Sequence, residues 1–144
     1  MREVFGKYSG TIFSPDYPVP YPDDASCVWR LVAPRDKEVK IKFVDIELRG
    51  NSMNDVNDNC VKNYTYMDHV EISDGFRPFH GGIYCGNQTV SDVYSNYEIM
   101  YVTFSAISVG VRGKRGFKAH FEAVDLSGIC AVLRIYFLFF NTEM

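Results

Sequence analysis

The amino-acid sequence predicts an all-β sandwich. Short segments in which apolar and polar residues alternate recur at intervals of roughly 8–12 residues, and no convincing amphipathic helical pattern lies between them. The aromatic residues, 10 Tyr, 11 Phe and one Trp, favour strands. An apolar fraction of 47% in 144 residues is ample for one core, so a single domain is expected.

The first two predicted strands flank a stiff loop. Residues 8–13 form a short strand, and the following run, residues 14–24, contains four prolines. Proline fixes φ and lacks an amide donor, so this run is expected to be an extended loop rather than a helix or a central strand. Residues 27–33 are the second strand, with Trp29 on the face expected to enter the core.

The third predicted strand changes phase along its length. Val39, Ile41 and Phe43 alternate with two lysines, which is typical of a strand with one face in the core. At residues 44–48 the alternation slips by one position, as a β-bulge would make it. Residues 49–59 are rich in Asn and Asp, and a surface loop is expected there.

Three further strands are predicted in the second half of the chain. Within residues 66–75, Asp68 and Val70 share one strand face, and the segment ends in an Asp-Gly turn. Residues 98–104 and 117–123 also alternate, the last of these most regularly.

The tail breaks this pattern. Residues 129–140 are apolar throughout except for Arg134. The segment is too short for a transmembrane helix, which needs ~20 residues. We interpret it as an extra strand or a non-native end, in preference to a truncated membrane span.

Charge and the N-terminal residues bear on partners and location. A net charge of −3 gives no reason to expect nucleic acid or an anionic membrane as partner. Residues 1–5 lack the apolar core of a signal peptide. If the protein is secreted, the sequence is therefore expected to be a fragment, a mature domain or an incomplete gene model. Membrane attachment would then come only through flanking sequence.

Cysteines and glycosylation motifs indicate an oxidising compartment. No pair of cysteines forms Cys-x-x-Cys and none sits with His at zinc-like spacing, so disulfide use is the better interpretation. N-glycosylation motifs begin at Asn63 and Asn87. Together these features predict a secreted protein or the ectodomain of a membrane protein. The four cysteines are Cys27, Cys60, Cys85 and Cys130.

The sequence carries no enzyme motif. It lacks His-Glu-x-x-His and Gly-x-Ser-x-Gly. His69, His80 and His120 are each interpreted as an ordinary surface or half-buried side chain rather than a catalytic base. We therefore expect neither catalysis nor a small-molecule substrate.

Six segments together form a recognisable pattern. In chain order they are residues 10–18 (Gly-Thr-Ile-Phe-Ser-Pro-Asp-Tyr-Pro) with 21–22, 27–29, the strand ending in Glu47, 66–75 (Tyr-Met-Asp-His-Val-Glu-Ile-Ser-Asp-Gly), 84–86 and 116–121. In this order they resemble the CUB domain. The resemblance covers about residues 5–124 and leaves residues 125–144 as the tail. It implies a two-sheet antiparallel, jelly-roll-like sandwich of CUB or spermadhesin type, found in extracellular and membrane-attached proteins and without catalytic activity.

The resemblance also implies a cysteine pairing. CUB domains usually pair four cysteines, first with second and third with fourth. Cys60 and Cys85 match the third and fourth, and a disulfide between them would stabilise the fold by roughly 3 kcal/mol. No cysteine precedes Cys27, which matches the second. Cys27 is therefore expected to be free and buried, with a bridge to Cys130 as the less favoured alternative.

A calcium site is the cofactor that the resemblance suggests. Many CUB domains hold Ca²⁺ at one end of the sandwich, and here the ligands would be Glu47 and Asp68, with Tyr17 steadying a carboxylate. The family's third carboxylate is absent, because Ala106 and Ile107 stand in its place. Calcium takes six to eight oxygen ligands, so the site is expected to be weak. The alternative is that both acids are solvated or pair with a nearby Arg or Lys.

The function that the resemblance implies is binding of an extracellular or membrane-receptor protein. Contacts are expected at the end carrying Tyr17, Glu47 and Asp68, together with the loop of residues 51–58, where an acid could replace the missing ligand. One alternative is a targeting or substrate-recruiting module of a larger tolloid-like or complement-like protease. Another is an ectodomain fragment of a receptor- or channel-associated membrane protein.

Overall fold

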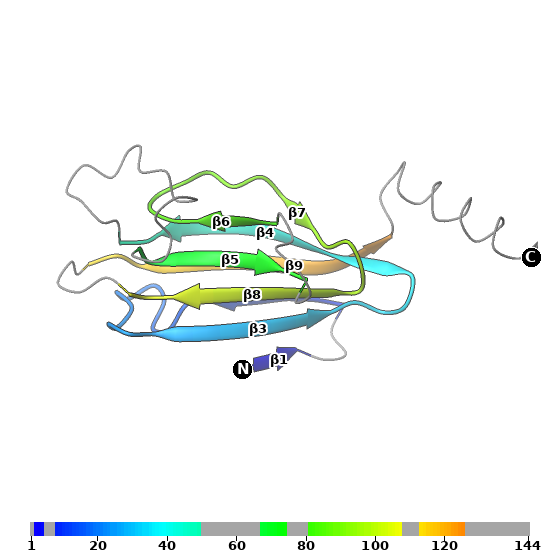
Figure 1. Cartoon of the computed structure of the whole chain (residues 1–144), viewed down its shortest axis with the longest axis horizontal. Helices are drawn as coiled ribbons and strands as arrows, with labels where there is room; N and C mark the ends of the chain where they lie inside the picture. The colour runs from blue at the N-terminus through cyan, green and yellow to red at the C-terminus, as the bar shows by residue number, and fades with distance from the viewer. Residues whose placement is uncertain (1, 5–7, 50–66, 75–80, 108–112, 126–144) are drawn as a thin grey trace, which may run out of the picture.

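The computed structural model describes residues 2–4, 8–49, 67–74, 81–107 and 113–125. These residues form two sheets and contain no helix (Figure 1). The strands are β1 (Arg2–Val4), β2 (Ser9–Phe13), β3 (Ser26–Val32), β4 (Lys37–Glu47), β5 (His69–Ser73), β6 (Gly82–Tyr84), β7 (Val93–Tyr94), β8 (Ile99–Ser105) and β9 (Gly116–Asp125). The described residues contain no helix that is long and apolar enough to cross a membrane.

The two sheets form the predicted antiparallel sandwich. One sheet has the order β1-β3-β8-β5-β6 and the other β2-β9-β4-β7. Every described strand pair is antiparallel except β1 with β3. Neighbouring strands such as β3 and β8 are far apart in sequence, so the fold rests on long-range pairing. The all-β sandwich expected from the alternation is confirmed.

Alternating residues of both sheets fill one core between them. Met100, Val102 and Phe104 of β8 are completely buried, as are Phe117 and Ala119 of β9. Apolar side chains at every second position of a strand point to the same face, which explains the periodicity of the sequence. Trp29, the single tryptophan, also lies in this core, with its ring edge-on to Phe117 at a centroid distance of 5.4 Å.

The predicted β-bulge lies in β4. The register between β4 and β9 shifts between Phe43 and Asp45. Before the bulge, Ile41 and Phe43 face the core, whereas after it Ile46 does so and Val44 is exposed. One extra residue in a strand reverses which positions face inward, so the slip in the sequence pattern has a structural cause.

Three strands were not expected from the sequence. β1, β6 and β7 are two or three residues long, and so short a segment cannot show a repeating alternation. Each pairs with a single described neighbour, which places all three at sheet edges.

One end of the sandwich gathers several loops, and we call it the loop end. It comprises residues 14–25, 48–49, 67–68, 106–107 and 113–115, which connect or flank β2, β3, β4, β5, β8 and β9 (Figure 1). Of the residues expected at a calcium site, Tyr17 and Asp68 lie in the loop end, and Glu47, the last residue of β4, adjoins it. Asp125, the first residue of the predicted tail 125–144, is the last residue of β9. Several predicted features lie outside the described residues: Cys60, Asn63, Cys130, the loop of residues 51–58 and the rest of the tail, residues 126–144.

Candidate functional site

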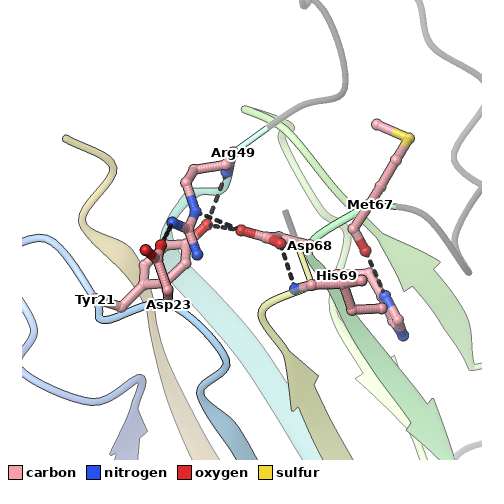
Figure 2. A network of polar contacts seen from close by, with 7 residues as sticks. Tyr21, Asp23, Arg49, Met67, Asp68 and His69 are labelled. Atoms are coloured by element: carbon pink, nitrogen blue, oxygen red, sulfur yellow. Dashed lines mark hydrogen bonds and ion pairs between the residues drawn. The ribbon is translucent and has the colours of Figure 1, made fainter. Parts of the chain in front are cut away.

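Asp68 is the buried acid at the centre of the loop end. It directly precedes β5 and is completely buried, and both of its carboxylate oxygens accept hydrogen bonds (Figure 2). The Tyr21 hydroxyl donates to Oδ2 over 2.7 Å, and the backbone N–H of Ile107 donates to Oδ1 over 2.6 Å. A buried carboxylate is costly unless it is paired and hydrogen-bonded, so these donors meet part of that requirement.

Arg49 supplies the opposite charge. It lies two residues beyond β4 with a side chain only 2% exposed, and its Nε donates to Oδ2 of Asp68 over 2.6 Å (Figure 2). Its Nη1 pairs with Asp23, and its guanidinium carbon lies 4.6 Å from the centre of the Tyr21 ring. The planar, forked guanidinium can serve several acceptors and an aromatic face at once. One cation therefore joins three segments of the loop end.

Tyr21 ties this network to the core. Its ring packs edge-on against Phe104 with centroids 5.1 Å apart. Its hydroxyl accepts a hydrogen bond from the backbone N–H of Arg49 over 2.8 Å while donating to Asp68. The prolines that flank Tyr21 in the sequence restrict its loop, so the ring is presented on a stiff segment.

Tyr21 and Arg49 both keep their protons in this network. Burial raises the pKa of Tyr21, and its hydrogen bond to Asp68 acts in the same direction, so the phenol keeps its proton. Burial lowers the pKa of Arg49, but the hydrogen bonds to Asp23 and Asp68 outweigh that effect and leave the pKa raised. Arg49 is therefore a permanent cation beside Asp68.

A second ionic cluster lies nearer the surface of the loop end. Arg115 donates to both carboxylate oxygens of Asp45 over 3.0 Å, and its Nη1 lies 2.7 Å from Oε2 of Glu47. The Tyr17 hydroxyl donates to Asp45 over 2.8 Å, and Lys114 lies 3.8 Å from Glu47. The Arg115 hydrogen bonds lower the pKa of Asp45, and the bond from Tyr17 acts in the same direction.

The structure places the expected calcium residues in two separate clusters. Asp68 pairs with Arg49, whereas Glu47 pairs with Arg115, and Tyr17 steadies Asp45 rather than either of them. Of the residues standing where a third carboxylate is expected, Ala106 is buried and Ile107 uses its backbone N–H on Asp68. Within the described ranges, no three His, Cys, Asp or Glu side chains gather where they could hold a metal. The described residues therefore do not by themselves fit a calcium ion.

The remaining predicted site residues are dispersed over the fold. Cys27, in β3, has a free thiol and is half-buried. Cys85 is buried beside Met67 and is disulfide-bonded, but Cys60 lies outside the described residues, so the pairing of these two stays a prediction. Asn87 is exposed, as glycosylation would require. His120 is exposed, and its Nδ1 is hydrogen-bonded to Oγ1 of Thr11 over 2.7 Å.

The sequence did not identify Arg49 and Asp23 as members of the site, and it did not indicate that the Tyr21 hydroxyl binds Asp68. It offered pairing with a nearby Arg or Lys as an alternative for Glu47 and Asp68, and the structure identifies the partners. Arg49 stood at the start of a predicted polar surface loop, where an arginine is usually solvated. The phase after the bulge predicts that Ile46 and Leu48 face inward, but Arg49 follows Leu48 directly, so the alternation carries no signal for its burial.

The fold and the loop end together define an antiparallel β-sandwich whose end is closed by ion pairs. Residues 2–121 match the family model of the CUB domain, and the chain belongs to this family. It is 37% identical over 118 residues to human Tolloid-like protein 2, covering 80% of this chain but only 10% of that protein. The chain thus spans about a tenth of that relative's length.

Two solved structures show the same fold. The full extracellular region of zebrafish Gpr126/Adgrg6 is 27% identical with a TM-score of 0.66, and the match covers 83% of this chain and 14% of that one. The MASP-1 CUB2 domain bound to Ca²⁺ is 25% identical with a TM-score of 0.59, and the match covers 82% of this chain and 95% of that one. CUB domains are non-catalytic modules, and one relative of this fold holds calcium.

Proposed function

We propose that this chain is an extracellular, non-catalytic module that binds a protein partner through its loop end. Membership of the CUB family supports the absence of chemistry, and similarity to part of an extracellular region supports the location. The fold itself hosts many functions, so the argument for binding must come from the surface at a particular site.

The observation that carries the proposal is that two apolar side chains are exposed on loop-end segments tied to the buried network. Val19 is 63% exposed and Ile107 is 42% exposed. Both belong to segments fixed by the buried network, since Ile107 donates to Asp68 and Val19 lies two residues before Tyr21. Protein interfaces combine an apolar centre with a polar rim, and preformed loops lower the entropy cost of binding.

This assignment differs in one respect from the surface expected from sequence. Asp68 is completely buried and is positioned to hold the loops rather than to touch a partner. Tyr17 and Glu47 remain partly exposed, so both can contribute to a polar rim.

The test is a binding screen followed by matched variants. The 144-residue chain, displayed as a bivalent fusion, is screened against an array of extracellular and receptor proteins, and each hit is re-measured with Val19→Asp and Ile107→Asp. Burying a new carboxylate at an interface is expected to weaken binding about tenfold or more, or ~1.4 kcal/mol. The control is Val44→Asp, which makes the same substitution at an exposed position on the outer face of β4.

Two outcomes would contradict the proposal. One is the absence of any binder in the array. The other is binding that survives both loop-end substitutions and is lost in Val44→Asp, because that would assign the contact to the outer face of the sheet.

A second candidate function is recruitment of substrate or target for a larger tolloid-like protease. The 37% identity to human Tolloid-like protein 2 favours it. The full-length transcript tests it: an open reading frame that joins this domain to a metalloprotease domain supports the candidate, whereas a frame joined to a full-length apolar span favours a receptor-associated ectodomain instead.

The extracellular assignment includes two covalent features. We propose a disulfide between Cys60 and Cys85, and glycans on Asn63 and Asn87. Non-reducing peptide mapping of the secreted chain should recover a peptide linking Cys60 to Cys85. Treatment with an N-glycosidase should convert the occupied asparagines to aspartate; unmodified Asn63 and Asn87 in secreted material would contradict the glycan assignment.

A further inference from the structure

We infer that the Arg49 guanidinium serves in this domain as the cation of the loop end, in place of Ca²⁺, so that the loop end is formed without metal. The inference concerns the same end of the sandwich as the proposed function, but it does not depend on any partner. It rests on the fit between Arg49 and the acid that the family resemblance would assign to calcium.

Among the described residues, both carboxylate oxygens of Asp68 already accept hydrogen bonds. Oδ2 accepts from both the Tyr21 hydroxyl and Arg49 Nε, and Oδ1 accepts from the N–H of Ile107, all over 2.6–2.7 Å. Calcium needs six to eight oxygens at about 2.3–2.6 Å, mostly from carboxylates, carbonyls and water. The groups that contact Asp68 here are N–H and O–H donors. They direct hydrogen atoms toward the carboxylate, whereas a calcium site needs oxygen lone pairs directed toward the metal.

Charge argues in the same direction. Arg49 is ion-paired with both Asp68 and Asp23, so the position of a cation between these two segments is already occupied. Glu47, the other expected ligand, has its own cations in Arg115 and Lys114. A divalent ion at Asp68 would lie beside a buried guanidinium, and repulsion between two cations in a poorly solvated site is strong.

The tethered cation performs the structural task that a bound ion would perform. Through Arg49 and Tyr21, the end of β4, the start of β5 and the loop of residues 14–25 are held together. A guanidinium is covalently part of the chain, so neither chelation nor a low calcium concentration can remove it. The loop end should therefore have the same stability in calcium-rich and calcium-free surroundings.

The experiment compares melting temperatures of the full 144-residue chain in millimolar CaCl₂ and in excess EGTA. We expect the two values to agree within about 1 °C, since a ligand that does not bind the folded state cannot stabilise it. The MASP-1 CUB2 domain, which was solved with Ca²⁺, is the positive control and should melt at a higher temperature in calcium. A rise of about 4 °C or more in this chain would overturn the inference.

A substitution tests whether Arg49 is the cation that matters. Arg49→Met keeps much of the stem and removes the charge, leaving Asp68 buried without it; the melting temperature should fall by about 10 °C in either buffer. Arg35→Met, at an exposed arginine in the turn between β3 and β4, is the matched control and should change little. Equal, small effects of the two substitutions would overturn the inference. If Arg49→Met fails to fold, the comparison of the unsubstituted chain in calcium and EGTA still decides it.

Discussion

At the scale of single residues, the loop end depends on charges that are buried together. Arg49 and Asp68 have side chains that are 2% and 0% exposed. Bringing two such ions out of water is costly, and only direct contact with additional hydrogen bonds offsets that cost. The pair therefore determines which loops come into contact more than it adds to the net stability of the fold. Removing one partner alone should be more destabilising than replacing both with apolar side chains, because it leaves the other charge buried without a partner.

Asp68→Asn tests this expectation directly. The amide keeps the size of the side chain but leaves Arg49 buried with one anion fewer, so the free energy of unfolding should fall by about 3–5 kcal/mol. Urea denaturation followed by tryptophan fluorescence measures it, because Trp29 lies in the core. Asp24→Asn is the matched control: this exposed residue has φ of 56°, a conformation that asparagine accepts readily. Similar stability of the two variants would contradict the buried pair.

The surface cluster predicts a pH dependence of stability. Arg115 lowers the pKa of Asp45 below its ordinary value of 3.8. A carboxyl whose pKa is lower in the folded state contributes stability above its unfolded pKa and loses it as pH falls through the folded pKa. Arg115→Gln should therefore lower the melting temperature at neutral pH, and the difference from the unsubstituted chain should shrink below pH 3.8.

The control for this prediction is Lys42→Gln, which removes a charge from the exposed outer side of β4. It should leave the pH profile parallel to that of the unsubstituted chain. A gap for Arg115→Gln that widens on acidification would contradict the pairing with Asp45.

At the scale of elements, the start of β9 depends on close approach between two chain segments. Gly116 has φ of 94°, and a Cβ there would collide with the Ser14 hydroxyl. Ser14 is completely buried, and its Oγ accepts a hydrogen bond from the N–H of Phe117 over 3.0 Å. The first residue of β9 and the loop after β2 are thus held together through a hydroxyl that occupies the space of a missing side chain.

Gly116→Ala should consequently destabilise the domain more than Gly113→Ala. Both glycines have positive φ, so alanine costs about 1–2 kcal/mol at either position. Only Gly116 is crowded, and displacement of Ser14 should add about 1–3 kcal/mol. Nothing lies within 4 Å of a Cβ built at Gly113, which makes it the control for backbone strain alone. Equal losses in chemical denaturation would show that the contact with Ser14 is unimportant.

The strands could be predicted from the sequence to different degrees. The long strands β4, β8 and β9 each repeat an apolar residue at alternate positions, and even the bulge after Phe43 is visible as a change of phase. The short strands β1, β6 and β7 exist because a neighbouring strand offers an edge for hydrogen bonding. Their own residues carry too little pattern to reveal that pairing.

At the scale of the whole molecule, the loop end brings together residues that the sequence separates widely. Tyr21, Arg49, Asp68 and Ile107 come from four segments, and only the packing of the two sheets places them in contact. Family resemblance singled out Asp68 as a calcium ligand, whereas the structure shows its carboxylate hydrogen-bonded to Tyr21 and Arg49. It could not identify Arg49 as the partner, because that depends on where the chain runs after the bulge in β4.

A whole-molecule prediction concerns the proposed disulfide between Cys60 and Cys85. A cross-link stabilises mainly by restricting the unfolded chain, so Cys60→Ala and Cys85→Ala should each lower the free energy of unfolding by roughly 3 kcal/mol. The double variant should lose no more than either single one. Cys27→Ala, which removes a free thiol, is the control and should cost less. Additive losses at Cys60 and Cys85 would contradict the pairing.

A metal-free loop end depends above all on the position of the Arg49 guanidinium, and a crystal structure of the chain grown in millimolar CaCl₂ measures that position. The expected result is Arg49 Nε within hydrogen-bonding distance of Asp68 Oδ2, as in the present geometry, with no metal beside the carboxylate. A calcium ion at about 2.3–2.6 Å from Asp68, with Arg49 turned out toward solvent, would contradict it.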